Sequence, residues 1–213
     1  MAMHLLSVNT GQATPIHIGN KVDQTGIYKT PVREAVLVDT LGLLGDVQVD
    51  KEHHGGVDQA VYIYSQEDYA YWSAELGYEL KPGTFGENLT LSAFPKKLYI
   101  GDRFGIGDVI LEITSPRIPC STLASRMNDL GFVKTFAKAE RPGVYTRVLQ
   151  KGKVQAGEAV SFTRGNSDVT ILDYFRFVYA KQPSNAQLET LLAAPIDERG
   201  RAHYQEVLAK QTA

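Results

Sequence analysis

The chain is poor in cysteine, in excess charge of either sign and in long hydrophobic runs. Its 213 residues include one cysteine, Cys120, so a disulfide within the chain is excluded. The 22 basic and 24 acidic side chains leave a formal net charge of -2, which gives no electrostatic reason to expect a nucleic acid polymer or an acidic membrane as a partner. No run of about 18 apolar residues occurs that could span a bilayer. With 43% hydrophobic residues, the composition is that of a globular protein with a full core.

The first residues, MAMHLLSVNTG, do not have the pattern of a secretory signal. Their apolar run is short, and they lack a basic flank and a small-residue cleavage site. Together with the single cysteine, this predicts a protein of the reducing cytoplasm.

Short runs rich in β-branched and aromatic residues recur between turn signals from residue 4 to about residue 164. They are HLLSVN, EAVLVD, AVYIYS, LYIGDRFGIGDVILEI and VYTRVLQKGKVQAGEAVSF. This spacing predicts a mainly β domain over residues 1–164, a barrel or a sandwich. Helical spacing predicts interruptions over 65–77, ending at Gly77, and over 120–131. The second of these helices is expected to turn an apolar stripe toward the core, formed by Leu123, Met127 and Leu130.

After residue 164 the composition changes, and three short helical patterns predict a small C-terminal domain over 165–213. The first helix has Ser167 or Asp168 as a candidate cap, and Ser184 with Gln187 forms a capping box for the second. A helix-turn-helix fold for DNA binding is one reading of such a domain. Five basic against six acidic residues in this segment show no basic face, so a packing or interaction role is favoured.

Cys120, in SPRIPC, could be a buried apolar group, a reactive thiolate or a metal ligand. His53 and His54 precede a Gly55–Gly56 pair that either makes a tight turn or exposes N–H groups to an anion. Adjacent histidines on an extended backbone point to opposite sides, and no other histidine or cysteine lies at zinc-site spacing. A zinc site is therefore not expected.

Polar groups in three other segments could hold a ligand. In KPGTFGENL, Glu87 and Asn88 could read the edge of a heterocycle for which the glycines clear space, or the stretch could be a loop that Asn88 caps. Lys29, Arg117 and Arg147 each sit in or beside a strand-like segment, where a single charge is normally solvated. Together, these groups could hold a polar, phosphorylated ligand over a soft-metal ligand.

Six motifs in order resemble a MOSC domain, the family named after the C-terminal domain of molybdenum-cofactor sulfurases. They are GLLGD, HGGVDQAV, FGENLT, GDRFGIGDVILEI, SPRIPC and RPGVYTRVLQKGKV, and they run from residue 42 to residue 154. The helical tail beginning SDVT is similar to that of the YiiM group of this family. The resemblance covers essentially the whole chain. It implies a MOSC β-barrel with a few interspersed helices and a C-terminal three-helix domain.

The resemblance also implies a function and a set of site residues. The function is reduction of N-hydroxylated compounds, such as hydroxylaminopurines, hydroxylamines and amidoximes, by a molybdenum-pterin cofactor, without zinc or pyridoxal phosphate. Cys120 would ligate the molybdenum, with His54 the first candidate for a second catalytic group. Lys29, Thr30 and Arg117 would serve the cofactor phosphate. The other residues expected to bind the cofactor are His54, Gly55, Gly56, Asp58, Gly86, Glu87, Asn88 and Arg147.

Electrons would have to come from another protein. A common iron-sulfur cluster needs four cysteines, and no flavin or nicotinamide motif is visible, so a separate flavin or iron-sulfur reductase is the expected partner. A homodimer is expected from the family.

Two other functions use the same thiol. In one, the protein carries the cofactor, or sulfur as a persulfide on Cys120, without turnover of its own. In the other, Cys120 is the nucleophile of a hydrolase with His54 as base and Asp58 or Asn88 as the orienting group.

Overall fold

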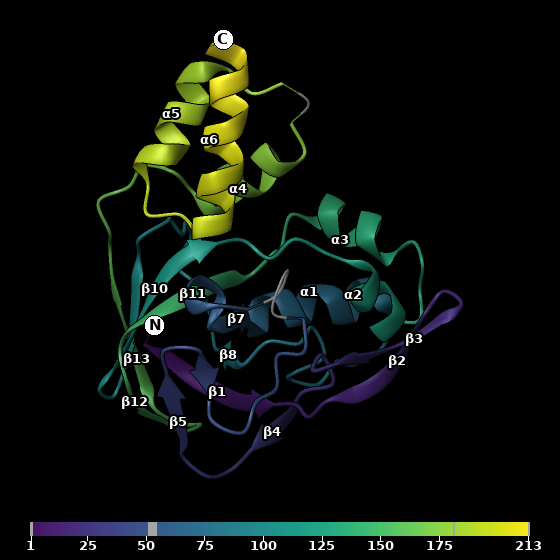
Figure 1. Cartoon of the computed structure of the whole chain (residues 1–213). Helices are drawn as coiled ribbons and strands as arrows, with labels where there is room; N and C mark the ends of the chain where they lie inside the picture. Colours follow the sequence, from purple (N-terminus) through teal and green to yellow (C-terminus); the bar gives the residue numbers. More distant parts are fainter. Residues whose placement is uncertain (1, 51–54, 181, 213) are drawn as a thin grey trace.

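The structure, a computed structural model, describes residues 2–50, 55–180 and 182–212. Within these residues, seven strands close into a barrel in the order β13, β9, β10, β11, β7, β8, β1, because β13 also pairs with β1 (Figure 1). All neighbours are antiparallel except β7 and β8. The barrel strands are β1 (Met3–Thr10), β7 (Val61–Ser65), β8 (Leu89–Leu91), β9 (Arg103–Ile106), β10 (Val109–Ser115), β11 (Val144–Gln150) and β13 (Ala159–Thr163).

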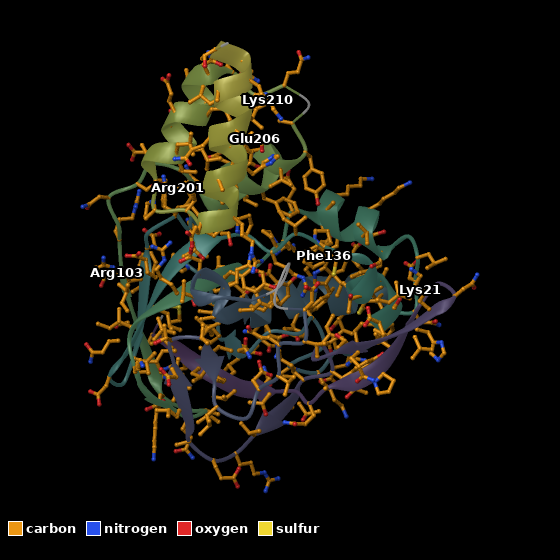
Figure 2. The ribbon with its side chains drawn as sticks, in the orientation of Figure 1. Lys21, Arg103, Phe136, Arg201, Glu206 and Lys210 are labelled. Carbon is orange, nitrogen blue, oxygen red and sulfur yellow. The ribbon has the colours of Figure 1, made fainter. Side chains whose placement is uncertain are left out.

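Shorter strands decorate the barrel. β4 (Thr30–Val32) pairs with β1, and β5 (Val36–Asp39) lies between β6 (Gly42–Leu43) and β12 (Gly152–Val154). β2 (Thr14–Ile18) and β3 (Lys21–Thr25) form a hairpin that projects from the barrel, with Lys21 near its tip (Figure 2). The mainly β architecture with interspersed helices and a helical C-terminus that we predicted is confirmed.

Successive side chains of β7 point to opposite faces of the strand and belong to two different hydrophobic clusters. Val61 and Ile63 belong to the cluster inside the barrel. Tyr62 and Tyr64 point to the other face and join an aromatic cluster with Trp72. Because successive side chains of a strand point to opposite faces, one strand holds together the barrel interior and the layer outside it. The outer layer positions the site described below.

The helices of this outer layer were predicted in part. α1 (Gln66–Leu76) is confirmed: the Ser65 hydroxyl accepts a hydrogen bond from the Asp68 N–H, and Gly77 ends the helix in the left-handed region at φ 76°. The second predicted helix is wrong at its C-terminal end. α2 (Ser121–Arg126) stops before Asn128, whose φ is 52°, and Leu130 is 88% exposed rather than buried. A separate helix, α3 (Phe132–Ala139), follows and buries Phe132 and Phe136.

The C-terminal segment forms α4 (Ile171–Val178), α5 (Asn185–Ala193) and α6 (Glu198–Thr212), stacked on one end of the molecule (Figure 1). The capping box of Ser184 and Gln187 is confirmed. The predicted cap of the first helix is wrong, because Thr170 with Asp173 forms the capping box there. Buried side chains of these helices share one hydrophobic cluster with the barrel interior. Of the described residues, no helix combines the length and the apolar character needed to cross a membrane.

Candidate functional site

A cavity lies on the outer face of β7 and β11, where Tyr62 and Tyr145 form its wall with ring centroids 4.9 Å apart. It encloses about 790 Å³ of empty space, part of it open to solvent. Loops between the elements complete the lining, around residues 23–29, 47–50, 55–59, 86–88 and 117–122. Six of the residues predicted as site residues line it together: Lys29, Gly55, Gly86, Asn88, Arg117 and Cys120.

Cys120 is placed by the short connection that leads from β10 to α2. It is half-buried, has an extended backbone at φ -132° and stands at the N-cap position of α2. Its carbonyl accepts hydrogen bonds from the N–H groups of Leu123 and Ala124, at 3.1 and 3.2 Å. The thiol is therefore carried by a backbone that the first turn of α2 holds in place.

Arg117 is a buried cation in the wall of the same pocket, so the expectation of a solvated charge is wrong for this residue. Its guanidinium lies 5.3 Å from the centroid of the Tyr62 ring and donates to the Phe85 carbonyl. Burial opposes its charge, but attraction to Tyr145, Tyr62 and Cys120 raises the pKa of Arg117 overall. Its Nε is buried and has no hydrogen-bond partner among the described residues. A buried N–H in this state can donate to water or to an acceptor on a bound group.

Lys29 is also buried, at 8% exposure, and the expectation of a surface charge is wrong here too. It forms an ion pair with Asp46. The same carboxylate accepts hydrogen bonds from the Gly11 N–H at 2.8 Å and the Asn88 side-chain amide at 2.9 Å. Burial lowers the pKa of Lys29, and Asp46 opposes this shift. Asp46 was not among the predicted site residues, although a buried lysine needs a carboxylate and GLLGD supplies one.

The side chains of Asn88 and Glu87 form hydrogen bonds with other groups of the protein. The Asn88 carbonyl oxygen accepts from the Tyr62 N–H at 3.1 Å, so this residue ties the loop to β7. Glu87 is fully buried, and its Oε1 accepts from the Tyr69 hydroxyl and the Gly83 N–H at 2.6 Å each, and from the Thr90 hydroxyl at 2.8 Å. Glu87 therefore organises the loop from within.

Two glycines of this loop allow it to approach another segment of the protein closely, and one of them, Gly86, also lines the pocket. A Cβ on Gly83, at φ 87°, would lie 2.4 Å from the Lys29 carbonyl oxygen. A Cβ on Gly86, at φ 77°, would lie 2.9 Å from a side-chain carbon of Ile27. The loop thus packs closely on the 27–29 segment, and this contact builds the pocket wall.

Other predicted site residues lie elsewhere. Asp58 forms an ion pair with Arg147 at 2.9 Å and, with Gly56, faces the start of α6. Thr30 is exposed on β4 and is not among the lining residues. His54 lies outside the described residues. The hydrolase hypothesis uses Asp58 or Asn88 to orient the base. Asp58 is paired with Arg147, and the Asn88 side chain is hydrogen-bonded to Tyr62 and Asp46.

The aromatic wall was missed by the sequence reasoning. Tyr62 is buried and Tyr145 is partly buried, and loss of contact with water raises the pKa of both hydroxyls. The alternation in AVYIYS could have indicated it, because it places Tyr62 opposite the apolar face of Val61 and Ile63.

The residues present fit a group that brings its own metal ligands. Among the residues with described positions, no three His, Cys, Asp or Glu side chains are clustered so as to hold a metal ion. A pterin cofactor supplies sulfur ligands itself and needs from the protein a soft thiolate together with donors for its phosphate. The pocket holds both kinds of group, the thiol of Cys120 and the Nε of Arg117, which has no hydrogen-bond partner within the described part of the chain.

Comparison with known proteins places this barrel and pocket in a class. Residues 50–161 match the MOSC domain family. YflK of Bacillus subtilis is 31% identical over 94% of this chain and 92% of that protein. A protein named reductase from Gibberella moniliformis is 32% identical over 84% of this chain, which is 33% of that protein. The crystal structure of YiiM from Geobacillus stearothermophilus superposes with a TM-score of 0.79 at 27% identity, covering 97% of this chain and 99% of that one.

The chain belongs to the MOSC domain family. The likeness to YiiM extends through α4, α5 and α6, so within that family the protein is YiiM-like.

Proposed function

We propose that the protein binds a molybdenum-pterin cofactor in this pocket and reduces N-hydroxylated compounds, such as hydroxylaminopurines, hydroxylamines and amidoximes. The observation that carries the proposal is the shared pocket of Cys120 and a buried Arg117 whose Nε has no hydrogen-bond partner among the described residues. Membership of the MOSC family and the similarity to a protein named reductase support it.

Different side chains of the pocket would bind the metal, the phosphate and the planar part of the cofactor. The Cys120 thiolate is the proposed molybdenum ligand, and the neighbouring guanidinium of Arg117 favours the thiolate form. Arg117 is a stronger candidate for the cofactor phosphate than Lys29, because Lys29 is already paired with Asp46. Tyr62 and Tyr145 offer aromatic faces to a planar group. When bound, the cofactor would supply the two electrons that break the N–O bond.

Burial raises the pKa of Tyr145, so its hydroxyl stays protonated and can donate a hydrogen bond to a bound group, but it is a poor source of protons. His54 remains the first candidate for a proton-transfer role. The roles proposed for Thr30, Gly56, Asp58 and Arg147 are not supported by their positions outside the pocket lining.

The electron donor we propose is a separate flavin or iron-sulfur reductase, since one cysteine cannot hold a four-cysteine cluster. A cytoplasmic location and a homodimer complete the proposal. The alternative is a carrier, which would bind the cofactor through the same thiolate without turnover.

The test is reduction of 6-N-hydroxylaminopurine by protein from a cofactor-competent host, with a chemical electron donor. We expect Cys120→Ala to lower kcat/KM by at least about a hundredfold, since it removes a metal ligand. Lys210→Ala, on the exposed side of α6, is the control and should keep full activity. A nicotinamide donor alone should support no turnover. Cofactor bound without turnover would favour the carrier, and activity retained by Cys120→Ala would refute the assigned ligand.

A further inference from the structure

The loop that carries Gly55 into the pocket is held by the helical C-terminus. Gly55 and Gln59 line the pocket, and 57–59 form a short 3₁₀ helix. Gly55 and Gly56 both have positive φ, 145° and 87°. Glycine pairs have the largest conformational freedom to lose, so a loop built on them needs contacts that fix its shape.

The first turn of α6 supplies such contacts. Arg199 donates from Nη2 to the Gly55 carbonyl at 2.8 Å and from Nη1 to the Gln59 side-chain oxygen at 3.5 Å. In a further contact, the loop supplies the side chain: the Asp58 carboxylate accepts a hydrogen bond from the Glu198 N–H at 2.8 Å. A carboxylate of this loop thus caps a helix that begins 140 residues later in the chain.

The barrel strand β11 contacts the segment just before α6 through Arg147. Arg147 on β11 pairs with Asp58, and its Nη2 donates to the carbonyls of Pro195 and Ile196 at 3.1 Å each. Asp197 accepts from the Tyr174 hydroxyl at 2.8 Å and from the Gly200 N–H at 2.9 Å. The segment before α6 is therefore held on both sides, and Arg199 extends from a fixed base.

The charge of Arg199 also acts on the pocket wall. It lowers the pKa of Tyr145, against the larger effect of burial. A guanidinium from the tail therefore lies within electrostatic range of the same wall that Arg117 and Cys120 line.

We propose that Arg199 is a positioning residue of the cofactor site: by holding the Gly55 carbonyl, it sets the shape of the 55–59 loop that the cofactor contacts. The helical C-terminus then completes the pocket rather than only covering the barrel. This inference rests on the proposed function for the identity of the ligand, and on the contacts of the cofactor-free protein for the positioning itself.

The experiment compares Arg199→Ala with Arg201→Ala. Arg201 is a matched control, since it lies on the same helix and donates to two carbonyls of the C-terminal segment, Leu192 and Ala194, at 2.6 and 2.7 Å. Figure 2 shows it within the helical part. Two readouts are used: hydrogen exchange of a peptide covering residues 55–62 in the cofactor-free protein, and the rate at which the molybdenum-pterin group leaves the loaded protein.

We expect Arg199→Ala to speed exchange in this peptide by about tenfold, the effect of losing one charge-assisted hydrogen bond, and to speed cofactor loss by a similar factor. Arg199→Lys should restore part of both effects, because lysine keeps the positive charge and can donate to one of the two acceptors, but lacks the forked geometry of the guanidinium. Arg201→Ala should leave the peptide at the wild-type rate. Unchanged exchange in Arg199→Ala, or an equal increase in Arg201→Ala, would overturn the inference. Wild-type protein that binds no cofactor would refute the proposed function, while the exchange result would still decide whether Arg199 positions the loop.

Discussion

At the scale of single residues, the pocket wall and the loop behind it contain ionisable side chains that folding has removed from water. Lys29, Glu87 and Arg117 are buried, and Lys29 lies within electrostatic range of the other two. An isolated buried charge is costly, so each must be paired, hydrogen-bonded or neutral. Lys29 has Asp46, and Arg117 has the Phe85 carbonyl and the Tyr62 ring. Glu87 has three donors on Oε1, while Oε2 is buried with no hydrogen-bond partner among the described residues.

This arrangement predicts a pH signature for Glu87. Burial raises its pKa above the ordinary 4.5, although the three donors oppose the shift. A carboxyl with a raised pKa in the folded state contributes stability that is complete below the unfolded pKa and is lost as pH rises through the folded pKa. Glu87→Gln cannot ionise and keeps an acceptor for the three donors. From pH 4.5 up to the raised folded pKa of Glu87, the free energy of unfolding of the wild type should fall relative to that of Glu87→Gln, by up to about 1.4 kcal/mol per pH unit.

Urea unfolding of both proteins between pH 4 and 8 measures this difference. Glu79→Gln, at an exposed position, controls for the loss of one negative charge. Curves for wild type and Glu87→Gln that stay parallel over the whole range would show that Glu87 does not keep its proton in the folded state.

At the scale of elements, the sequence predicts helix ends correctly where residues next to the helix in sequence determine them. α1 could be predicted because its cap at Ser65 and its end at Gly77 lie next to its apolar face in sequence. The break between α2 and α3 could not, since it depends on Asn128 adopting a positive φ. α4 begins later than predicted, because Thr170 and Asp173 form its capping box in place of a cap at Ser167 or Asp168. Cys120 could be singled out by its uniqueness, whereas the Lys29–Asp46 pair and the contact of Asp58 with α6 join segments far apart in the chain.

At the scale of the whole molecule, the barrel and the C-terminal helices share a core. Ile171, Leu188 and Leu191 belong to the same buried cluster as Ile63 and Phe104. The division at residue 164 remains a prediction, but a shared apolar core favours joint unfolding, because separation would expose both faces.

We therefore predict that thermal or urea unfolding of the cofactor-free protein gives one transition. The single tryptophan, Trp72, is buried in the aromatic cluster outside the barrel, so its fluorescence reports on that part of the chain. Circular dichroism at about 222 nm includes α4, α5 and α6. The midpoints of the two signals should coincide. An early loss of ellipticity while the fluorescence is unchanged would show that the helical segment unfolds alone.

The central claim is that Cys120 binds molybdenum, and X-ray absorption at the molybdenum edge tests it most directly. The samples are wild-type protein and Cys120→Ser, both from a cofactor-competent host and both analysed for metal content. We expect stoichiometric molybdenum in the wild type, with one more sulfur neighbour than any molybdenum retained by Cys120→Ser. Equal sulfur neighbours and equal metal content in the two proteins would contradict it.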